Sequence, residues 1–178
     1  MSSPKPKQEV TDTREKEVME EGKSEQKKKV MVAIDESDCS RYALIWALEN
    51  LHETIAVSEL ILFTVQPIVD LSYAMVSTLG SAPPDLITSI QENQKKIALT
   101  LLEKAKDICA KHGVVAKTVT EVGDPKNTIY EAVEKLNIQL LVLGSHGRGA
   151  LQRVFLGSVS NYCVQYVKCP VLVVRKTV

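Results

Sequence analysis

Glycine and serine residues cluster near the carboxyl terminus at a spacing that could hold a phosphate group. The cluster runs through Gly144-Ser145-His146-Gly147-Arg148-Gly149 and continues at Gly157-Ser158-Val159-Ser160. Glycine has no Cβ, so an anion can approach the main-chain N–H groups closely. A helix that starts at the second glycine-serine pair would add its unpaired N–H groups and the positive end of its dipole. This pattern predicts an anion site between a strand and a helix.

Side chains in the same cluster could add further contacts. Ser158 and Ser160 offer hydroxyl groups, and Arg148 could form a charge-assisted hydrogen bond. His146 is the histidine nearest to the expected site, although a loop histidine is more often a solvated polar residue than a catalytic base. The spacing of the glycines matches neither the Walker A loop nor the dinucleotide fingerprint. A tight strand-to-helix connection remains the alternative interpretation.

Asp35 is the second candidate for chemistry because it ends a short apolar run of strand length. The run Val30-Met31-Val32-Ala33-Ile34 precedes it directly. A carboxylate at this position could cap the following helix. Its place at the end of a strand beside the predicted crevice favours a contact to a ligand or a metal ion instead.

Apolar runs alternate with helical patterns along the chain. We expect strands at 30–35, 60–65, 114–122, 138–143 and 170–174, and helices at 38–52, 85–111, 125–136 and 157–167. Asp38 and Asp124 are the expected caps of the first and third helices. Strands that are apolar throughout, separated by helices, indicate a parallel sheet covered on both faces. We predict a three-layer, doubly wound, Rossmann-like α/β fold with five parallel strands and a ligand crevice between strands one and four.

Two segments fall outside this pattern. Residues 1–28 are dense in charges of both signs and poor in apolar side chains, so we expect a disordered arm. Residues 29–178 should form a single domain. The excursion at 67–84 is long for a compact domain and should be either a lid or a disordered insertion.

Composition argues against several classes of function. The net charge is zero, and no basic stripe is present that would suit nucleic acid. No apolar run is long enough for a membrane span, and the amino terminus lacks the apolar core of a signal peptide, so we expect a cytoplasmic protein. The four cysteines form no C-x-x-C pair and are best explained as core residues.

The chain resembles the universal stress protein family in its ATP-binding branch, across residues 29–178. The resemblance rests on the end of the first strand at 32–35, on Gly123-Asp124, on residues 143–149 and 157–160, and on Cys169-Pro170 with the apolar run after them. The charged arm and the 67–84 excursion depart from the minimal family pattern, although longer single-domain plant members carry a comparable insertion.

The resemblance implies a fold similar to the adenine nucleotide alpha hydrolases and a site for ATP, AMP or ADP, with Mg²⁺. It places Ala33 and Asp35 beside adenosine and ribose, with Asp35 a candidate contact to Mg²⁺ through the nucleotide, and the backbone of Val65 beside adenine. It places Gly144, Gly147, Gly157, Ser158 and Val159 beside the phosphates. Ile34, Ser145, His146, Arg148 and Ser160, which lie next to these residues in the sequence, complete the predicted site. It also implies a homodimer through the last strand, 170–175.

Family membership suggests a nucleotide-dependent regulatory or protective dimer in the stress response, with an unidentified protein partner. The alternatives are a slow ATPase or phosphotransferase, or a stress chaperone in which nucleotide binding is incidental. A flavin carrier is disfavoured because aromatic residues, which usually stack on flavin, make up 4% of the chain.

Overall fold

The computed structural model describes residues 27–68, 84–146 and 156–176. Five parallel strands form one sheet in the order β3-β2-β1-β4-β5. The strands are β1 (Lys29–Ala33), β2 (Glu59–Pro67), β3 (Ala116–Gly123), β4 (Leu140–Gly144) and β5 (Val171–Val174). The helices are α1 (Asp38–Asn50), α2 (His52–Ala56), α4 (Pro84–Lys111), α5 (Pro125–Lys135) and α6 (Ser158–Tyr166). The predicted five-stranded α/β fold is confirmed.

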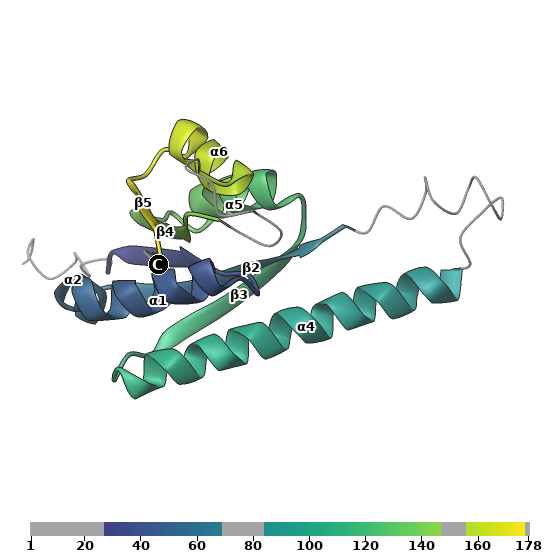
Figure 1. Cartoon of the computed structure of the whole chain (residues 1–178), viewed down its shortest axis with the longest axis horizontal. Coiled ribbons are helices and arrows are strands. Elements are labelled where there is room, and N and C mark those ends of the chain that lie inside the picture. Colours follow the sequence, from purple (N-terminus) through teal and green to yellow (C-terminus); the bar gives the residue numbers. More distant parts are fainter. Residues whose placement is uncertain (1–26, 69–83, 147–155, 177–178) are drawn as a thin grey trace, which may run out of the picture.

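Helices cover both faces of the sheet (Figure 1). α1 and α4 lie on one face, and α5 and α6 lie on the other. Because side chains alternate along a strand, Val30 and Val32 of β1 join the first core, while Met31 and Ala33 join the second. β1 is central in the sheet, which explains why its sequence is apolar on both faces.

The starts of α1 and α5 are both capped by side chains, but one cap differs from the prediction. Ser37, not Asp38, is the N-cap of α1, and its hydroxyl accepts a hydrogen bond from the N–H of Ser40. Asp38 is the first helical residue, and its carboxylate lies 3.8 Å from the ammonium group of Lys176. Asp124 caps α5 as predicted.

β2 and β3 extend differently from the expected strands. β2 reaches Pro67, beyond the expected end at residue 65. By alternation, the main-chain nitrogens of Glu59, Val65 and Pro67 fall on the β1 side, since the N–H of Glu59 donates to the carbonyl of Lys28. β1 pairs with β2 only as far as Phe63, so the amide that proline lacks would have had no strand partner.

β3 begins at Ala116, two residues later than expected, because its pairing with β2 starts at Ala116 opposite Leu60, while the N–H of Val114 bonds back to the carbonyl of Cys109 in α4. Val115 is 93% exposed and Val122 is 64% exposed. The short α2 was not expected, since five residues carry too little helical periodicity to be recognised.

Two of the sequence predictions concern segments that the structure describes only in small part. Most of the expected arm at 1–28 and most of the expected excursion at 67–84 lie outside the described residues. None of the helices in the described part combines the length and apolar character that a membrane span requires.

Candidate functional site

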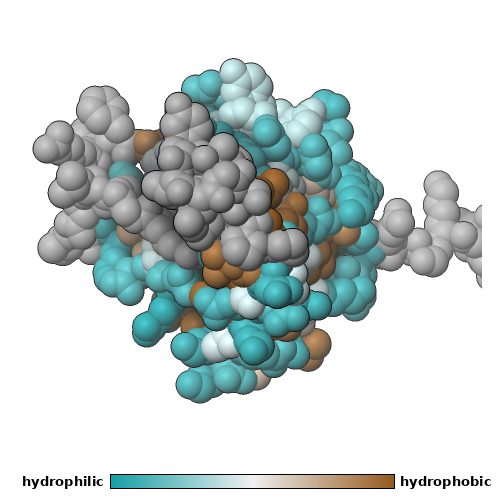
Figure 2. All heavy atoms as spheres, turned by 90° about the vertical axis from the view of Figure 1, so that its right-hand side faces the viewer, coloured by the Kyte–Doolittle hydropathy of each residue, from teal (hydrophilic) through white to brown (hydrophobic). Residues whose placement is uncertain are grey.

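A cavity of about 360 Å³ opens where β1, β2 and β4 end. Figure 2 views this edge of the molecule and shows apolar atoms at its centre, surrounded by polar ones. Ten of the predicted site residues line the cavity together: Ala33, Ile34, Asp35, Val65, Gly144, His146, Gly157, Ser158, Val159 and Ser160. The position between β1 and β4 is the predicted crevice, where the winding of the sheet reverses.

The other predicted residues are placed differently. Ser145 is buried beside the cavity, and its hydroxyl lies 3.1 Å from Nδ1 of His146. Gly147 and Arg148 lie outside the described residues. The sequence interpretation missed six further lining residues, namely Ser40, Phe63, Pro67, Pro125, Ile129 and Leu143. Pro125 and Ile129 come from α5, and no local motif signals that this helix packs beside the cavity.

Asp35 lines the cavity and is positioned by hydrogen bonds with two serines. Its carboxylate accepts hydrogen bonds from the N–H and the hydroxyl of Ser37. Its main-chain N–H donates to Oγ of Ser40 at 2.9 Å, and that hydroxyl donates back to the Asp35 carbonyl at 2.9 Å. The carboxylate is therefore oriented before any ligand arrives, as a contact to a ribose hydroxyl requires.

The two ends of the glycine loop are tied together by hydrogen bonds. The N–H of Gly157 donates to the carbonyl of Ser145 at 2.8 Å. The hydroxyl of Ser160 lies 3.0 Å from that carbonyl and 3.0 Å from the carbonyl of Gly157. Ser160 thus lines the cavity, while its single hydroxyl proton is used by main-chain carbonyls. Its contribution in this structure is to position the start of α6.

The start of α6 turns main-chain N–H groups toward the cavity. Gly157 is the N-cap, and a glycine has no side chain that could cap these groups. The first intrahelical bond runs from the N–H of Asn161 to the carbonyl of Gly157, so the N–H groups of Ser158 and Val159 precede it. Together with the helix dipole they form an anion-binding end. A Cβ on Gly157 would lie 3.2 Å from the carbonyl oxygen of Ser145, which leaves little room for a larger residue.

β2 supplies a second set of main-chain groups to the cavity. The N–H of Ile34 donates to the carbonyl of Phe63 at 2.8 Å, so the main-chain groups of Phe63 face β1. Two residues later, alternation turns the N–H and C=O of Val65 toward the same side. β1 pairs with β2 only to Phe63, and the cavity lies beyond. Val65 can therefore offer one donor and one acceptor to a flat heterocycle.

The described wall carries little formal charge. Asp35 and His146 are its titratable side chains, and no lysine or arginine lines the cavity within the described ranges. A phosphate would therefore depend on main-chain N–H groups in this part of the wall. No group of three side chains suited to a metal ion occurs among the described residues.

The comparisons with known proteins agree with this architecture. A family model described as the universal stress protein family matches residues 27–175. A universal stress protein A-like protein of Arabidopsis thaliana is 32% identical over 158 residues, which cover 83% of this chain and 90% of the relative. The universal stress protein YxiE of Bacillus subtilis is 35% identical over 147 residues, which cover 83% of this chain and 98% of the relative.

Solved structures show the same fold. A universal stress protein family structure from Arabidopsis thaliana with AMP bound superposes with a TM-score of 0.60 and 26% identity, covering 84% of this chain and 92% of that one. A universal stress protein in complex with cAMP superposes with a TM-score of 0.59 and 21% identity, covering 85% of this chain and 99% of that one. The matched residues, the sheet order and the shared fold lead to one conclusion: the chain belongs to the universal stress protein family.

Proposed function

We propose that the chain binds an adenine nucleotide in the cavity at the ends of β1, β2 and β4. The observation that carries the proposal is that main-chain groups from two distant elements converge on one cavity. Val65 offers a donor and an acceptor at one side, and the start of α6 offers N–H groups at the other. Adenine has both donors and acceptors on its edge, and its phosphates suit a helix N-terminus.

Asp35 occupies the position between these two ends and would accept a hydrogen bond from a ribose hydroxyl. The AMP-bound relative from Arabidopsis thaliana supports the choice of an adenine nucleotide. We propose ATP with Mg²⁺ as the physiological ligand, with Asp35 as the residue nearest to the cation. Gly147 and Arg148 complete the proposed phosphate contacts.

The proposed role is a nucleotide-dependent regulatory or protective homodimer that acts in the stress response. β5 is an edge strand, and its partner in the dimer would be β5 of a second copy. A hydrogen bond of 2.9 Å from the N–H of Ser145 to the carbonyl of Val174 links β5 to the glycine loop. A shift of the glycine loop on ligand binding would therefore be transmitted to β5, and so to the proposed interface, through the bond between Ser145 and Val174.

Replacing Ser158 tests the phosphate end of the site. Ser158 is the first residue of α6, where proline is well tolerated, and Gly157 has the extended ψ of 160° that a following proline requires. Ser158→Pro removes one N–H group from the cavity, while Ser158→Ala removes only the hydroxyl. We expect Ser158→Pro to weaken ATP binding about tenfold relative to Ser158→Ala, a loss of about 1.4 kcal/mol, in isothermal titration calorimetry of the full chain.

Adenosine and EDTA serve as the controls in the same titrations. Ser158→Pro should leave adenosine binding unchanged, because adenosine has no phosphate, and the far-ultraviolet circular dichroism should remain that of the parent. Removing Mg²⁺ with EDTA should weaken ATP binding more than AMP binding. Failure of the parent protein to take up ATP or AMP would refute the proposed site, and equal ATP affinities of the two Ser158 variants would refute the assignment of its phosphate end.

A further inference from the structure

A second cavity lies on the opposite face of the sheet from α5 and α6, between α1 and α4. Its volume is about 460 Å³, which is in the range of small-molecule sites. Its wall on α4 extends from Lys96 to Ile108, about 18 Å along the axis at 1.5 Å per residue. The cavity, which we call the α1/α4 groove, is therefore long as well as large. It shares Ile34, Asp35 and Ser40 with the nucleotide cavity, which lies on the other side of these residues.

The floor of the groove is apolar. It consists of Ile34, Leu44, Ile97, Leu101, Ala105 and Ile108. Ile97, Leu101 and Ile108 are only half-buried although they belong to the long helix that covers this face. A ligand with a hydrocarbon chain would remove this surface from water. A small polar anion would leave it uncovered.

The rim of the groove carries positive side chains that have no ion-pair partner in the described part of the chain. These are Arg41, Lys96 and Lys104, all of them exposed. Three acidic residues, Asp35, Glu36 and Asp38, also line the groove, all at or just before the start of α1. Asp35 accepts hydrogen bonds from Ser37, and Asp38 faces Lys176. Lys96 and Lys104 belong to the other wall, on α4, and are the cations that we expect to meet an anionic ligand.

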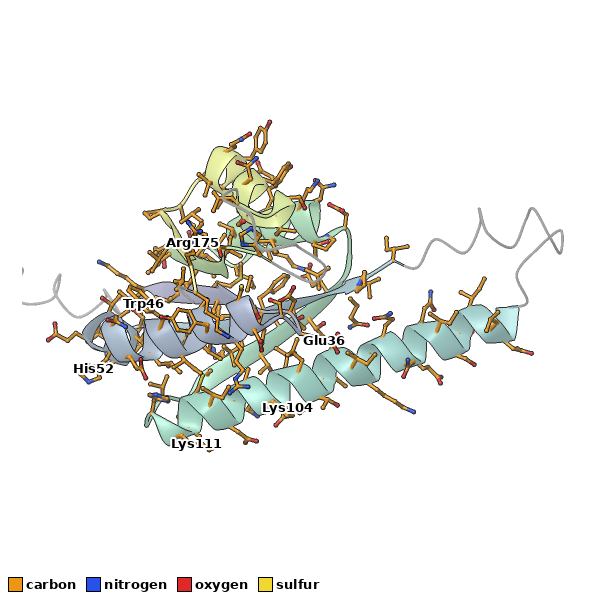
Figure 3. The ribbon with its side chains drawn as sticks, viewed as in Figure 1. Glu36, Trp46, His52, Lys104, Lys111 and Arg175 are labelled. Atoms are coloured by element: carbon orange, nitrogen blue, oxygen red, sulfur yellow. The ribbon has the colours of Figure 1, made fainter. Side chains whose placement is uncertain are left out.

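Two of the three cations and four of the six floor residues come from α4. Lys96, Thr100 and Lys104 follow each other at intervals of four residues, so they lie on one stripe of α4. Ile97 and Leu101 form the adjacent stripe, one residue further along. Figure 3 shows Lys104 on α4 and Glu36 beside the start of α1, the two elements that bound the groove. A cationic edge directly beside an apolar floor matches a molecule with one anionic end and a hydrocarbon body.

We propose that the α1/α4 groove binds a long-chain fatty acid, with its hydrocarbon chain on the apolar floor and its carboxylate paired with the cations of the rim. This proposal does not depend on nucleotide binding, because the floor and the rim cations belong to this groove alone apart from Ile34. Ile34, Asp35 and Ser40 line both cavities, so ligand binding to the groove is measured with the nucleotide site empty.

The binding test uses the full chain without nucleotide and the fluorescent fatty acid cis-parinarate. Trp46 on α1 is the single tryptophan of the chain and can transfer excitation energy to bound parinarate. We expect saturable binding with one molecule per chain and displacement by laurate. Dodecanol lacks the carboxylate and butyrate lacks the long chain, so neither should displace parinarate at the same concentration. Absence of saturable binding, or displacement by dodecanol as effective as that by laurate, would overturn the proposal.

Paired variants test the location. Lys96→Glu combined with Lys104→Glu should weaken parinarate binding at least about tenfold, because it replaces attraction of the carboxylate by repulsion. Lys95→Glu combined with Lys111→Glu makes the same change of charge on α4 away from the groove and should leave binding unchanged. Thr100→Phe should block the groove, whereas Leu99→Phe, at the neighbouring exposed position outside it, should not.

Two further results would count against the proposal. Equal binding by the two double-lysine variants would show that the carboxylate is not recognised at the rim. A changed sedimentation mass of the Lys96→Glu/Lys104→Glu variant, with unchanged parinarate affinity, would assign the groove to contact between copies of the chain.

Discussion

Gly144 occupies the point where β4 meets the main chain at the start of α1. A Cβ at this position would lie 2.8 Å from the carbonyl carbon of Cys39 and 2.8 Å from the amide nitrogen of Ser40. These are backbone atoms, which cannot rotate away as a flexible side chain can. The glycine therefore permits close packing of α1 on β4, which in turn places Asp35 and Ser40 at the cavity.

The close approach at Gly144 predicts a large effect of a single methyl group. Gly144→Ala should lower the free energy of unfolding by about 3 kcal/mol, as overpacking in a core typically does. Gly113→Ala is the matched control, because its site is open and its φ of +70° imposes only the left-handed strain, about 1 kcal/mol. Urea denaturation followed by circular dichroism measures both. Equal losses in the two variants would contradict the packing role.

The burial of two thiols predicts that the free energy of unfolding decreases at alkaline pH. Burial raises the pKa of Cys109 and of Cys163 to about 11, from a usual value near 9. Between pH 9 and pH 11 the unfolded chain would release these protons while the folded chain keeps them, so stability should fall as the pH rises through this interval. The Cys109→Ala/Cys163→Ala variant should show a smaller fall in its urea midpoint over the same interval. An equally steep fall in the variant would exclude the thiols as the cause.

Ser160 illustrates how far residue types alone can define a site. Its place next to a glycine-serine pair predicted a hydroxyl near the phosphate, and the structure does place it at the cavity. Its hydroxyl, however, lies 3.0 Å from the carbonyl of Ser145, fifteen residues earlier in the chain. A sequence does not reveal such a contact, because it depends on how the loop closes.

At the scale of elements, the sequence predicted the strands and long helices well because their signals are local. Apolar runs of strand length and helical spacing identified all five strands and four of the helices. The errors occur where two local signals compete or where the signal is short. Ser37 and Asp38 are both good caps, and the hydrogen bond between Ser37 and Asp35 accompanies the choice of Ser37.

The cap of α5 predicts a measurable contribution of one carboxylate. The Asp124 carboxylate accepts hydrogen bonds from the N–H groups of Lys126 and Asn127 at 3.1 and 3.2 Å, and Pro125 follows at the first helical position. Asp124→Ala should lower the free energy of unfolding by about 1 kcal/mol. Asp124→Asn should retain most of the stability, because an amide oxygen also accepts these bonds. Thermal unfolding of the three proteins measures the difference, and equal stability of the alanine variant and the parent would contradict the capping role.

At the scale of the whole molecule, the cavity combines residues from distant parts of the sequence. The rule that ligands bind where the winding of a parallel sheet reverses predicts a site between β1 and β4 from the order of the elements alone. It did not reveal the contribution of α5, since Pro125 and Ile129 reach the cavity only through the packing of α5 against the sheet. Nor did it reveal the α1/α4 groove, which depends on how two helices with no shared sequence pattern lie beside each other.

The hydrogen bonds of β5 define which of its main-chain groups remain at the open edge. The carbonyls of Pro170 and Val174 accept bonds from Leu141 and Ser145, on the β4 side. By alternation, the N–H and C=O groups of Val171 and Val173 face away from β4, toward the edge. These are the groups that would pair with a second β5 in the proposed homodimer.

Proline at position 173 therefore tests the dimer without breaking the sheet. Val173→Pro removes an N–H group that faces away from β4, at an edge strand where proline is tolerated. We expect the parent chain to sediment as a dimer and Val173→Pro as a monomer, while Val173→Thr, which keeps the N–H group, remains a dimer. Each variant should retain the circular dichroism of the parent, because the hydrogen bonds between β4 and β5 lie along the opposite edge of β5. A dimer that persists in Val173→Pro would place the interface elsewhere, and a monomeric parent would remove the basis for a nucleotide-dependent dimer.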